Sequence, residues 1–390
     1  MNRSYSDVVV IGAGPAGLVL SEVLARRGMS VTVVERQNDP ARSPQGALLQ
    51  PVTLDLLHRL IEFRHSVELE GSITAIEEYS PEEQIFAGSF EDLPGAPVGY
   101  ALNVTQGMLR KSLLDRVGEH PSVAVLAGTQ VRRLERTEAG NCRTVVAPVD
   151  DPDHQLTLRS RWLIAADGKQ SETREMAGID TRLEGADHTL SLVPVPTPED
   201  YPRTIRAHRR TDGMATTVPG ASPGLTYVFT HLMGREATPD QVAQWCRTVL
   251  RDEDRPLADA LRSNALLDRV ITITPQIVSA SAWRREGVLL LGDCAHGMHN
   301  IGGQGVNTSI QDALLVAEAL CRHAEDGDSG PIDDFIALRR PFIDEFQTAQ
   351  QKLGSGFWPA SGSTSWFEKR FEELSLGQAG LRTAWRDVIF

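Results

Sequence analysis

Three glycines near the start of the chain have a spacing that suits the binding of phosphate groups. The residues GAGPAG place Gly12, Gly14 and Gly17 directly after the apolar run Val8–Ile11. In a turn from a strand into a helix, the first glycine permits the tight bend, the second lets a pyrophosphate approach the backbone, and the third lets helix and strand pack closely. The helix N-terminus offers unpaired N–H groups to the anion. The spacing therefore predicts a dinucleotide-binding turn.

The residues on either side of this turn predict the elements that position it. Val8–Ile11 is typical of a buried parallel strand, and Val31–Val34 of a second one. Between them, Leu18–Arg27 is typical of a helix, which Gly28 is placed to end. Glu35 follows the second strand, where its carboxylate can accept hydrogen bonds from an adenosine ribose. The sequence therefore predicts a βαβ unit that binds a dinucleotide.

Size and composition exclude several classes of protein. The 390 residues are 41% hydrophobic and 23% charged, which is typical of a globular protein with a large core. No run reaches the 18 or more apolar residues that a membrane-spanning helix needs. The formal net charge is -13 and only four of the 39 basic residues are lysines, whereas a nucleic-acid partner calls for a basic face. We therefore expect neither a membrane span nor a nucleic-acid partner.

The cysteines indicate neither a disulfide framework nor a zinc site. The four are far apart and form no CxxC pair: Cys142, Cys246, Cys294 and Cys321. No HExxH motif is present either. We also expect no Ser/His/Asp hydrolase elbow. We therefore expect no bound metal, and a location in the reducing cytoplasm.

Two further segments identify which dinucleotide fits. A strand at Trp162–Ala166 leads into ADGKQSETR, and one at Val288–Leu291 leads into GDCAHGMHNIGGQGVN. In the second segment Asp293 can hold a sugar-alcohol hydroxyl, and the N–H groups near Gly305–Asn307 can face a ring carbonyl. FAD has both of these chemical groups and NAD does not. The three segments together favour FAD.

In this order and at these separations, the three segments resemble the three fingerprints of the single-component flavoprotein monooxygenases of the p-hydroxybenzoate hydroxylase type. The resemblance covers most of residues 1–345. Within that family, the residues MH before the last glycines and the modest chain length are most similar to the ubiquinone-biosynthesis and quinolone hydroxylase branch. The resemblance implies an FAD enzyme that uses NADPH or NADH, with dioxygen, as co-substrate.

The resemblance also implies which residues contact FAD. The glycine turn, Glu35 and Arg36 match the adenosine site, and Asp293 matches the aspartate that holds the ribityl chain. Gln106, in VTQGMLRKSL, matches a glutamine that contacts FAD. The implied cofactor-binding residues are Gly12, Ala13, Gly14, Pro15, Ala16, Gly17, Glu35, Arg36, Arg42, Gln45, Gln106, Val131, Asp293, Gly303, Gln304, Gly305, Val306 and Asn307.

Two departures from the family pattern bear on the site. Asn300 occupies the position at which relatives usually have a proline, so an additional amide lies where the family carries out its reaction. Gln45 replaces an arginine that relatives often have, and Arg42 is a nearby substitute for the lost positive charge.

The predicted architecture is an α/β (α+β) fold in which a Rossmann-like FAD-binding domain is interrupted by an antiparallel sheet and followed by C-terminal helices. Residues 1–70, 101–180 and 281–330 are assigned to the FAD-binding domain, and 71–100 and 181–280 to a substrate-binding domain that covers the flavin. Residues 331–390 form a C-terminal helical segment. Its Phe367, Phe371 and Leu374 share one helical face, which favours packing against the core over contact with a membrane.

The resemblance implies that NAD(P)H reduces the flavin, that dioxygen forms a flavin hydroperoxide, and that an electron-rich aromatic or quinone-like substrate is hydroxylated or epoxidised. His299 and Asn300 are the candidate catalytic residues, because their motif lies beside the flavin and imidazole titrates near neutral pH. His296 is a candidate for a structural role. The candidate substrate-pocket residues lie on the covering strands: His208, Met214, Tyr227 and His231.

Three other functions use the same fold. A halogenase is disfavoured because no WxWxIP segment is present and lysines are few. A reductase or desaturase would keep GAGPAG and GD but would work without oxygen. A binding protein that carries FAD without catalysis would show no substrate-stimulated flavin reduction. The substrate, the choice between NADH and NADPH, and the oligomeric state are not readable from the sequence.

Overall fold

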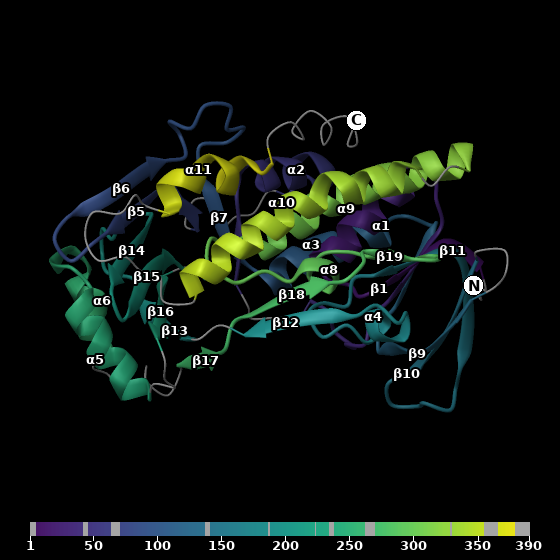
Figure 1. Ribbon diagram of the computed structural model, residues 1–390, viewed down its shortest axis with the longest axis horizontal. Coiled ribbons are helices and arrows are strands. Elements are labelled where there is room, and N and C mark those ends of the chain that lie inside the picture. The colour runs from purple at the N-terminus through teal and green to yellow at the C-terminus, as the bar shows by residue number, and fades with distance from the viewer. Residues whose placement is uncertain are drawn as a thin grey trace.

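The structure is a computed structural model. It describes residues 5–41, 46–63, 71–136, 141–185, 188–222, 224–233, 238–261, 270–327, 330–354 and 366–378. It is a mixed α/β fold, as predicted, in which two large sheets lie side by side along the long axis of the molecule (Figure 1).

The main sheet has eight strands. Its central path runs in the order β19-β20-β11-β1-β2-β8, and the hairpin β9–β10 continues antiparallel from β11. The strands are β1 (Tyr5–Ile11), β2 (Val31–Val34), β8 (Val123–Leu126), β9 (Thr129–Arg136), β10 (Cys142–Pro148), β11 (Leu156–Ala165), β19 (Arg284–Arg285) and β20 (Val288–Leu290). Val8, Val9 and Val10 are fully buried. This fits a parallel strand covered on both faces, because such strands form continuous apolar runs.

The order of the parallel strands gathers all three sequence segments at one edge. Strands β20, β11, β1 and β2 are neighbours and run parallel. GAGPAG follows β1, Glu35 follows β2, ADGKQSETR follows β11, and the GDCAH segment follows β20. Ligands of open α/β sheets bind outside the carboxyl ends of such strands.

Helices cover this sheet. They are α1 (Pro15–Arg26), α3 (Gln106–Gly118), α4 (Glu172–Met176), α8 (Asp293–His296), α9 (Gly305–Asp326) and α10 (Gly330–Gly354). The long helices α9 and α10 run side by side across the sheet (Figure 1). None of the helices within the described residues combines the length and hydropathy that a membrane span requires.

The second large sheet is named the roof sheet here. Its seven strands run in the order β17-β13-β16-β15-β14-β5-β6, and only the pair β14–β5 is parallel. The strands are β5 (Ala75–Tyr79), β6 (Gln84–Ser89), β13 (His188–Pro196), β14 (Thr204–Arg210), β15 (Gly213–Pro219), β16 (Leu225–Met233) and β17 (Ile271–Ile273). Residues 75–89 therefore join strands from residues 188–273. The domain assignment stays a prediction.

The two faces of the roof sheet pack against different cores. Ile205, Ala207 and Met214 belong to the main core that continues into the first sheet. Val193 and Val228 point the other way, into a smaller core with α5 (Pro239–Val249) and α6 (Arg255–Ala260). Because side chains alternate along a strand, this division tells which roof residues face the FAD-binding half.

Small elements connect the two halves. Two short sheets are present: β3 (Gly46–Leu49), β7 (Ala101–Thr105) and β4 (Ser72–Ile73), and the pair β12 (Thr181–Gly185) and β18 (Gln276–Ala280). The remaining helices are α2 (Pro51–Ile61), the one-turn η1 (Asp252–Asp254) and α11 (Trp366–Leu376). Phe367, Phe371 and Leu374 of α11 are buried in the main core, which confirms the prediction that this face packs inward.

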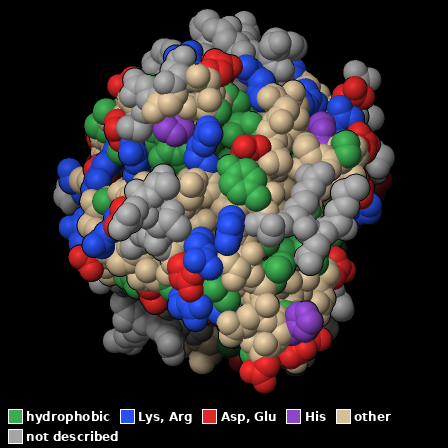
Figure 2. All heavy atoms as spheres, turned by 90° about the vertical axis from the view of Figure 1, so that its right-hand side faces the viewer, with side chains coloured by type: hydrophobic (Ala, Val, Ile, Leu, Met, Phe, Trp, Pro, Cys, Tyr) green, Lys and Arg blue, Asp and Glu red, His purple; other side chains and the backbone are tan. Residues whose placement is uncertain are grey.

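The outer surface carries both signs of charge. Figure 2 shows the right-hand side of Figure 1, where basic and acidic side chains are interspersed between patches of neutral surface.

Candidate functional site

A Cβ atom would fit at one of the three glycines of the turn and would clash at the other two. A Cβ atom on Gly12, whose φ is 107°, would lie 2.3 Å from the carbonyl oxygen of Ala166, and one on Gly17 would lie 2.2 Å from that of Gly12. By contrast, no atom lies within 4 Å of the Cβ position of Gly14. Gly14 is also the N-cap of α1, and no side chain caps that helix. The turn therefore presents open space and unpaired N–H groups, which fit a pyrophosphate.

Glu35 lies against this turn and has a basic neighbour that the sequence analysis missed. Its Oε2 accepts a hydrogen bond from the backbone N–H of Ala13 at 2.8 Å. Arg110 donates to the carbonyl oxygen of Ala13 at 2.9 Å, and its second nitrogen lies 3.4 Å from Glu35 Oε2. Burial lowers the pKa of Arg110, against the opposing effect of Glu35. Arg110 lies one helical turn after Gln106, and this spacing is the signal that could have found it.

The ADGKQSETR segment holds the strand ends together. Asp167 accepts hydrogen bonds from the Ser171 hydroxyl and from the N–H of Thr173. Arg174 is buried and donates to the carbonyl oxygen of Cys294 at 2.9 Å and to that of Lys169 at 3.1 Å. These contacts tie the segment after β11 to the segment after β20.

A second group of backbone N–H groups that could face a ligand lies at the start of α9. Residues 302–307 are named the ring cradle here. Asp293, at the start of α8, is half-buried, and its Oδ1 lies 3.6 Å from the Cβ position of Gly305. Gln304 is the N-cap of α9 and its side chain does not cap the helix. The first N–H groups of a helix have no intrahelical partner, so those of Gly305, Val306 and Asn307 can face a carbonyl group. The chemistry fits the ribityl chain and ring of FAD.

Some side chains of this cradle hold the loop itself. Asn307 is buried; its Oδ1 accepts from the N–H of Gln50 at 2.9 Å, and its Nδ2 donates to the carbonyl oxygens of Leu48 and Gly303, each at 2.7 Å. Gln304 donates to the carbonyl oxygen of Leu374 in α11 at 3.0 Å. These two predicted cofactor residues can therefore offer FAD their backbone, while their side chains bind protein.

Gln50 is a second residue that the sequence analysis missed. It is the N-cap of α2 and is 1% exposed. Both polar atoms of its side chain are buried without a protein partner. Because buried polar groups are normally hydrogen-bonded, this amide is suited to contact a ligand beside Asn307.

The candidate catalytic pair differ in how their side chains are engaged. His299 is buried; its Nδ1 accepts from the N–H of Ile301 at 3.0 Å, and its Nε2 lies 3.2 Å from Nε2 of His188. Burial, with the charges of His188 and Lys169, lowers the pKa of His299 to about 3, so its ring is neutral at pH 7. The Oδ1 atom of Asn300 is buried without a protein partner. Asn300 is therefore the member of the pair with an atom available to a substrate.

The roof sheet separates the four candidate pocket residues into two groups. Met214 lies in the main core, and Tyr227 and His231 alternate with Val228, which faces the outer core. These three residues therefore point toward the FAD-binding half. His208 points to the opposite face, because its neighbour Ala207 is in the main core.

His208 belongs instead to a polar network between the roof sheet and η1. Its Nε2 lies 2.7 Å from Asp254 Oδ2, and its ring stacks on that of Tyr79 with centroids 5.2 Å apart. Asp254 also accepts hydrogen bonds from Tyr201 and Arg206. Burial by itself raises the pKa of Asp254, but these bonds and the charge of Arg206 hold it below its usual value. The geometry gives His208 a structural position on the outer face of the roof.

The remaining predicted residues have these positions. Arg36 is exposed beyond β2, Gln106 is half-buried at the first position of α3, and Val131 is buried in β9. Arg42 and Gln45 lie outside the described residues. His296 is buried and pairs with Asp312 at 2.8 Å, as a structural residue would. The FAD contacts of these residues stay predictions.

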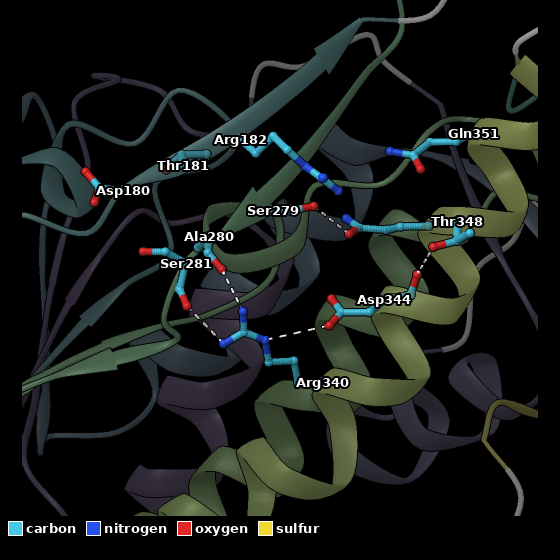
Figure 3. A pocket seen from close by; sticks show the side chains of 11 residues that line it. Asp180, Thr181, Arg182, Ser279, Ala280, Ser281, Arg340, Asp344, Thr348 and Gln351 are labelled. Atoms are coloured by element: carbon cyan, nitrogen blue, oxygen red, sulfur yellow. Dashed lines mark hydrogen bonds and ion pairs between the residues drawn. The ribbon is translucent and has the colours of Figure 1, made fainter.

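A groove of about 550 Å³ lies between the β12–β18 pair and α10 (Figure 3). Arg340 crosses it to the carbonyl oxygen of Ser281 at 3.1 Å, and Gln347 accepts from Ser279 at 2.9 Å. Gln347 also donates to the carbonyl oxygen of Gly297 at 3.1 Å. None of the predicted site residues lines this groove; its contacts attach α10 to the segment that leads to His299.

The arrangement defines a class of protein: a flavoprotein oxidoreductase, with a dinucleotide turn and a ring cradle at neighbouring strand ends beneath a second sheet. Comparison with known families agrees. The chain belongs to the family described as FAD binding domain, whose model matches residues 5–349. It is an FAD-dependent monooxygenase.

Individual relatives support this assignment. The chain is 31% identical to 6-methylpretetramide 4-monooxygenase of Streptomyces rimosus, over 93% of this chain and 86% of the relative. It is 26% identical to the ubiquinone hydroxylase UbiL of Rhodospirillum rubrum, over 86% and 78%. The crystal structure of PqsL, a probable FAD-dependent monooxygenase from Pseudomonas aeruginosa, has the same fold. Its TM-score is 0.78 at 19% identity, and the match covers 98% of this chain and all of the other.

Proposed function

We propose that this chain uses NADPH or NADH and dioxygen to hydroxylate, or epoxidise, an electron-rich aromatic or quinone-like small molecule in the cytoplasm. The two relatives are named as a 6-methylpretetramide 4-monooxygenase and a ubiquinone hydroxylase, which supports this substrate class. Four buried free cysteines support a reducing compartment. When bound, FAD would accept the hydride of NAD(P)H and activate dioxygen.

The observation that carries the proposal is the buried Oδ1 atom of Asn300, which has no protein partner. This atom can accept a hydrogen bond from a phenolic or enolic hydroxyl, which would orient the substrate ring. The roof face that points toward the FAD-binding half carries Tyr227, Phe229 and His231. Its cation Arg209 is already paired with Glu78 at 2.8 Å, and both are buried. Among the described residues, this face therefore suits an uncharged ring better than a carboxylate.

The geometry described above supports the remaining proposed roles. The turn at Gly12–Gly17 binds the pyrophosphate, and Glu35 with Arg110 holds the adenosine ribose. Asp293 binds the ribityl chain, and the first turn of α9 contacts the flavin ring. The roof sheet excludes water from the reacting ring, which favours oxygen transfer over wasteful oxidation.

The test is a panel of phenols, quinones, quinolones and aromatic polyketides, offered to the FAD-loaded protein with NADH or NADPH under labelled dioxygen. We expect one class to accelerate NAD(P)H consumption and to gain one labelled oxygen atom. Turnover that continues without oxygen would identify a reductase or desaturase. A product whose mass depends on chloride would identify a halogenase.

A further inference from the structure

Three histidines from distant parts of the chain converge beneath the roof. His188 begins β13, His231 lies in β16, and His299 lies between α8 and α9. All three are buried, with exposed fractions of 2–3%. Nε2 of His188 lies 3.1 Å from Nδ1 of His231 and 3.2 Å from Nε2 of His299. One nitrogen of each ring therefore faces the same small volume.

Two ring nitrogens face one lone pair in this arrangement. Nδ1 of His299 accepts from the N–H of Ile301, so a neutral His299 carries its proton on Nε2 and donates it to His188. An imidazole nitrogen has one lone pair, which at Nε2 of His188 then accepts from His299. Nδ1 of His231 either shares that lone pair or directs its own lone pair at it. A cation between the three rings could accept a lone pair from each of them.

Two of the three spacings in this cluster match the ligand set of a metal ion. For a tetrahedral ion with Zn–N bonds of about 2.0–2.1 Å, neighbouring ligand nitrogens are about 3.3 Å apart. His188 lies 3.1 Å from His231 and 3.2 Å from His299, and the ligand atoms of all three residues lie within 4.8 Å of one another. Burial also lowers the pKa of His231 well below its usual value, with His188 and His299 adding to the effect, so the ring is neutral and its lone pair is available.

We propose that His188, His231 and His299 form a binding site for a divalent transition metal ion of the zinc type. Three imidazole ligands leave a fourth position for water or a substrate oxygen atom. The sequence predicted no metal site. The three histidines come from separate segments and share no spacing motif that could have indicated one.

Metal binding has a structural consequence at one ligand. For Nε2 of His299 to bind the ion, the ring proton must move to Nδ1, and the bond from the N–H of Ile301 must break. Ile301 immediately precedes Gly302 and Gly303, which form the ring cradle. The metal site and the FAD loop are thus adjacent in the chain.

The test measures metal binding to the FAD-loaded protein after chelation and dialysis. We expect one Zn²⁺ per chain by titration calorimetry, and Co²⁺ absorption bands typical of tetrahedral nitrogen ligation. His231→Gln and His188→Gln should each weaken Zn²⁺ binding by at least about 100-fold, because loss of a ligand should cost no less than the roughly 10–100-fold that loss of an outer-shell partner costs. His154→Gln, which removes an exposed histidine, is the matched control and should leave binding unchanged.

Absence of stoichiometric Zn²⁺ uptake by the wild-type protein would overturn the proposal. So would binding that persists in both cluster variants, since the ion would then lie elsewhere. Should either variant fail to fold, X-ray absorption of the Zn²⁺-loaded wild-type protein replaces it: three imidazole ligands support the site, and an all-oxygen shell contradicts it.

Discussion

At the scale of single residues, the three glycines of the turn have separable roles. Gly12 and Gly17 are required by the fold, because a Cβ atom on either would meet a backbone carbonyl at 2.3 or 2.2 Å. Gly14 faces open space, so only the ligand requires its small size. Substitution of Gly14 therefore tests cofactor binding without changing the stability of the fold.

Gly14→Ala should leave the melting temperature of the FAD-free protein unchanged and raise the dissociation constant of FAD at least about tenfold, or about 1.4 kcal/mol. The added methyl group would occupy the space of the pyrophosphate. Fluorescence titration with FAD measures the change. Gly118→Ala, at another position with no neighbour within 4 Å, is the control and should affect neither quantity. Equal FAD affinity in Gly14→Ala would place the pyrophosphate elsewhere.

Asn300→Ala should lower kcat/KM at least about tenfold, the loss of about 1.4 kcal/mol of transition-state stabilisation. FAD affinity and stability should change little, because the Asn300 Oδ1 atom has no protein partner to lose. Steady-state kinetics with the substrate found in the panel provide the measurement. A large fall in thermal stability with unchanged kcat/KM would assign Asn300 to the fold instead.

Residue types in local motifs were predictable from the sequence, and residues brought in by tertiary contacts were not. The glycine turn and Asp293 could be found because strand, turn and helix follow one another in the chain. Gln50 and His188 carry no such local signal, since Gln50 meets Asn307 across 257 residues and His188 meets His231 and His299 across 43 and 111 residues. For Asn307 the position was predicted, but the engagement of its side chain with Leu48 depends on a contact across 259 residues.

At the scale of elements, α11 holds the ring cradle from behind. The ring of Phe371 contacts Phe86 and Phe90 of the segment after β5, with centroids 5.6 and 5.3 Å apart. The carbonyl oxygen of Leu374 accepts from Gln304, the N-cap of α9. Docking of α11 and the shape of the cradle are thus coupled.

Phe371→Ala should destabilise the protein by about 3–5 kcal/mol, because it leaves a cavity in the main core. It should also weaken FAD binding, since an undocked α11 no longer fixes Gln304. Urea denaturation and FAD titration measure the two effects. Glu372→Ala, a neighbouring position on the same helix, is the comparison and should preserve FAD affinity. Loss of stability with full FAD affinity would separate α11 from the cradle.

The network around Asp254 joins η1 to the roof sheet. Asp254→Asn should cost about 1.5–3 kcal/mol at pH 7, because Arg206 would lose one of its two carboxylate partners and keep Glu77. The pKa of Asp254 is lower in the folded protein than its ordinary 3.8. Its charge therefore stabilises the fold above pH 3.8, and this contribution disappears as the pH falls through the folded-state value.

Urea denaturation of the wild type and Asp254→Asn, at pH 7 and at decreasing pH below 4, provides the measurement. The difference in unfolding free energy should shrink as the pH falls. A difference that stays constant down to the acid limit would show that the carboxylate charge is not the stabilising group.

The alternation of strand residues predicted the roof sheet, but not which face each residue takes. His208 and His231 both lie on roof strands, yet one faces the outer core and the other the FAD-binding half. Period-two patterning is the same on either face when both faces are buried. Only the packing of α5 and α6 on one side distinguishes them.

At the scale of the whole molecule, strand order explains why distant segments form one site. β20, β11, β1 and β2 are adjacent and parallel, so four chain segments end at the same edge of the sheet. The roof face that points toward the FAD-binding half carries apolar and neutral side chains and the buried ion pair of Arg209 and Glu78. A single extended cofactor such as FAD is a ligand that could contact all four segments at once.

The most direct test of this account is the titration of FAD into the purified protein, together with one variant from each of two separate segments, Gly14→Ala and Asp293→Ala. The account predicts one FAD per chain and weaker binding at that same single site in both variants. A well-folded wild-type protein that takes up no FAD, or two binding events that the two variants affect separately, would contradict it.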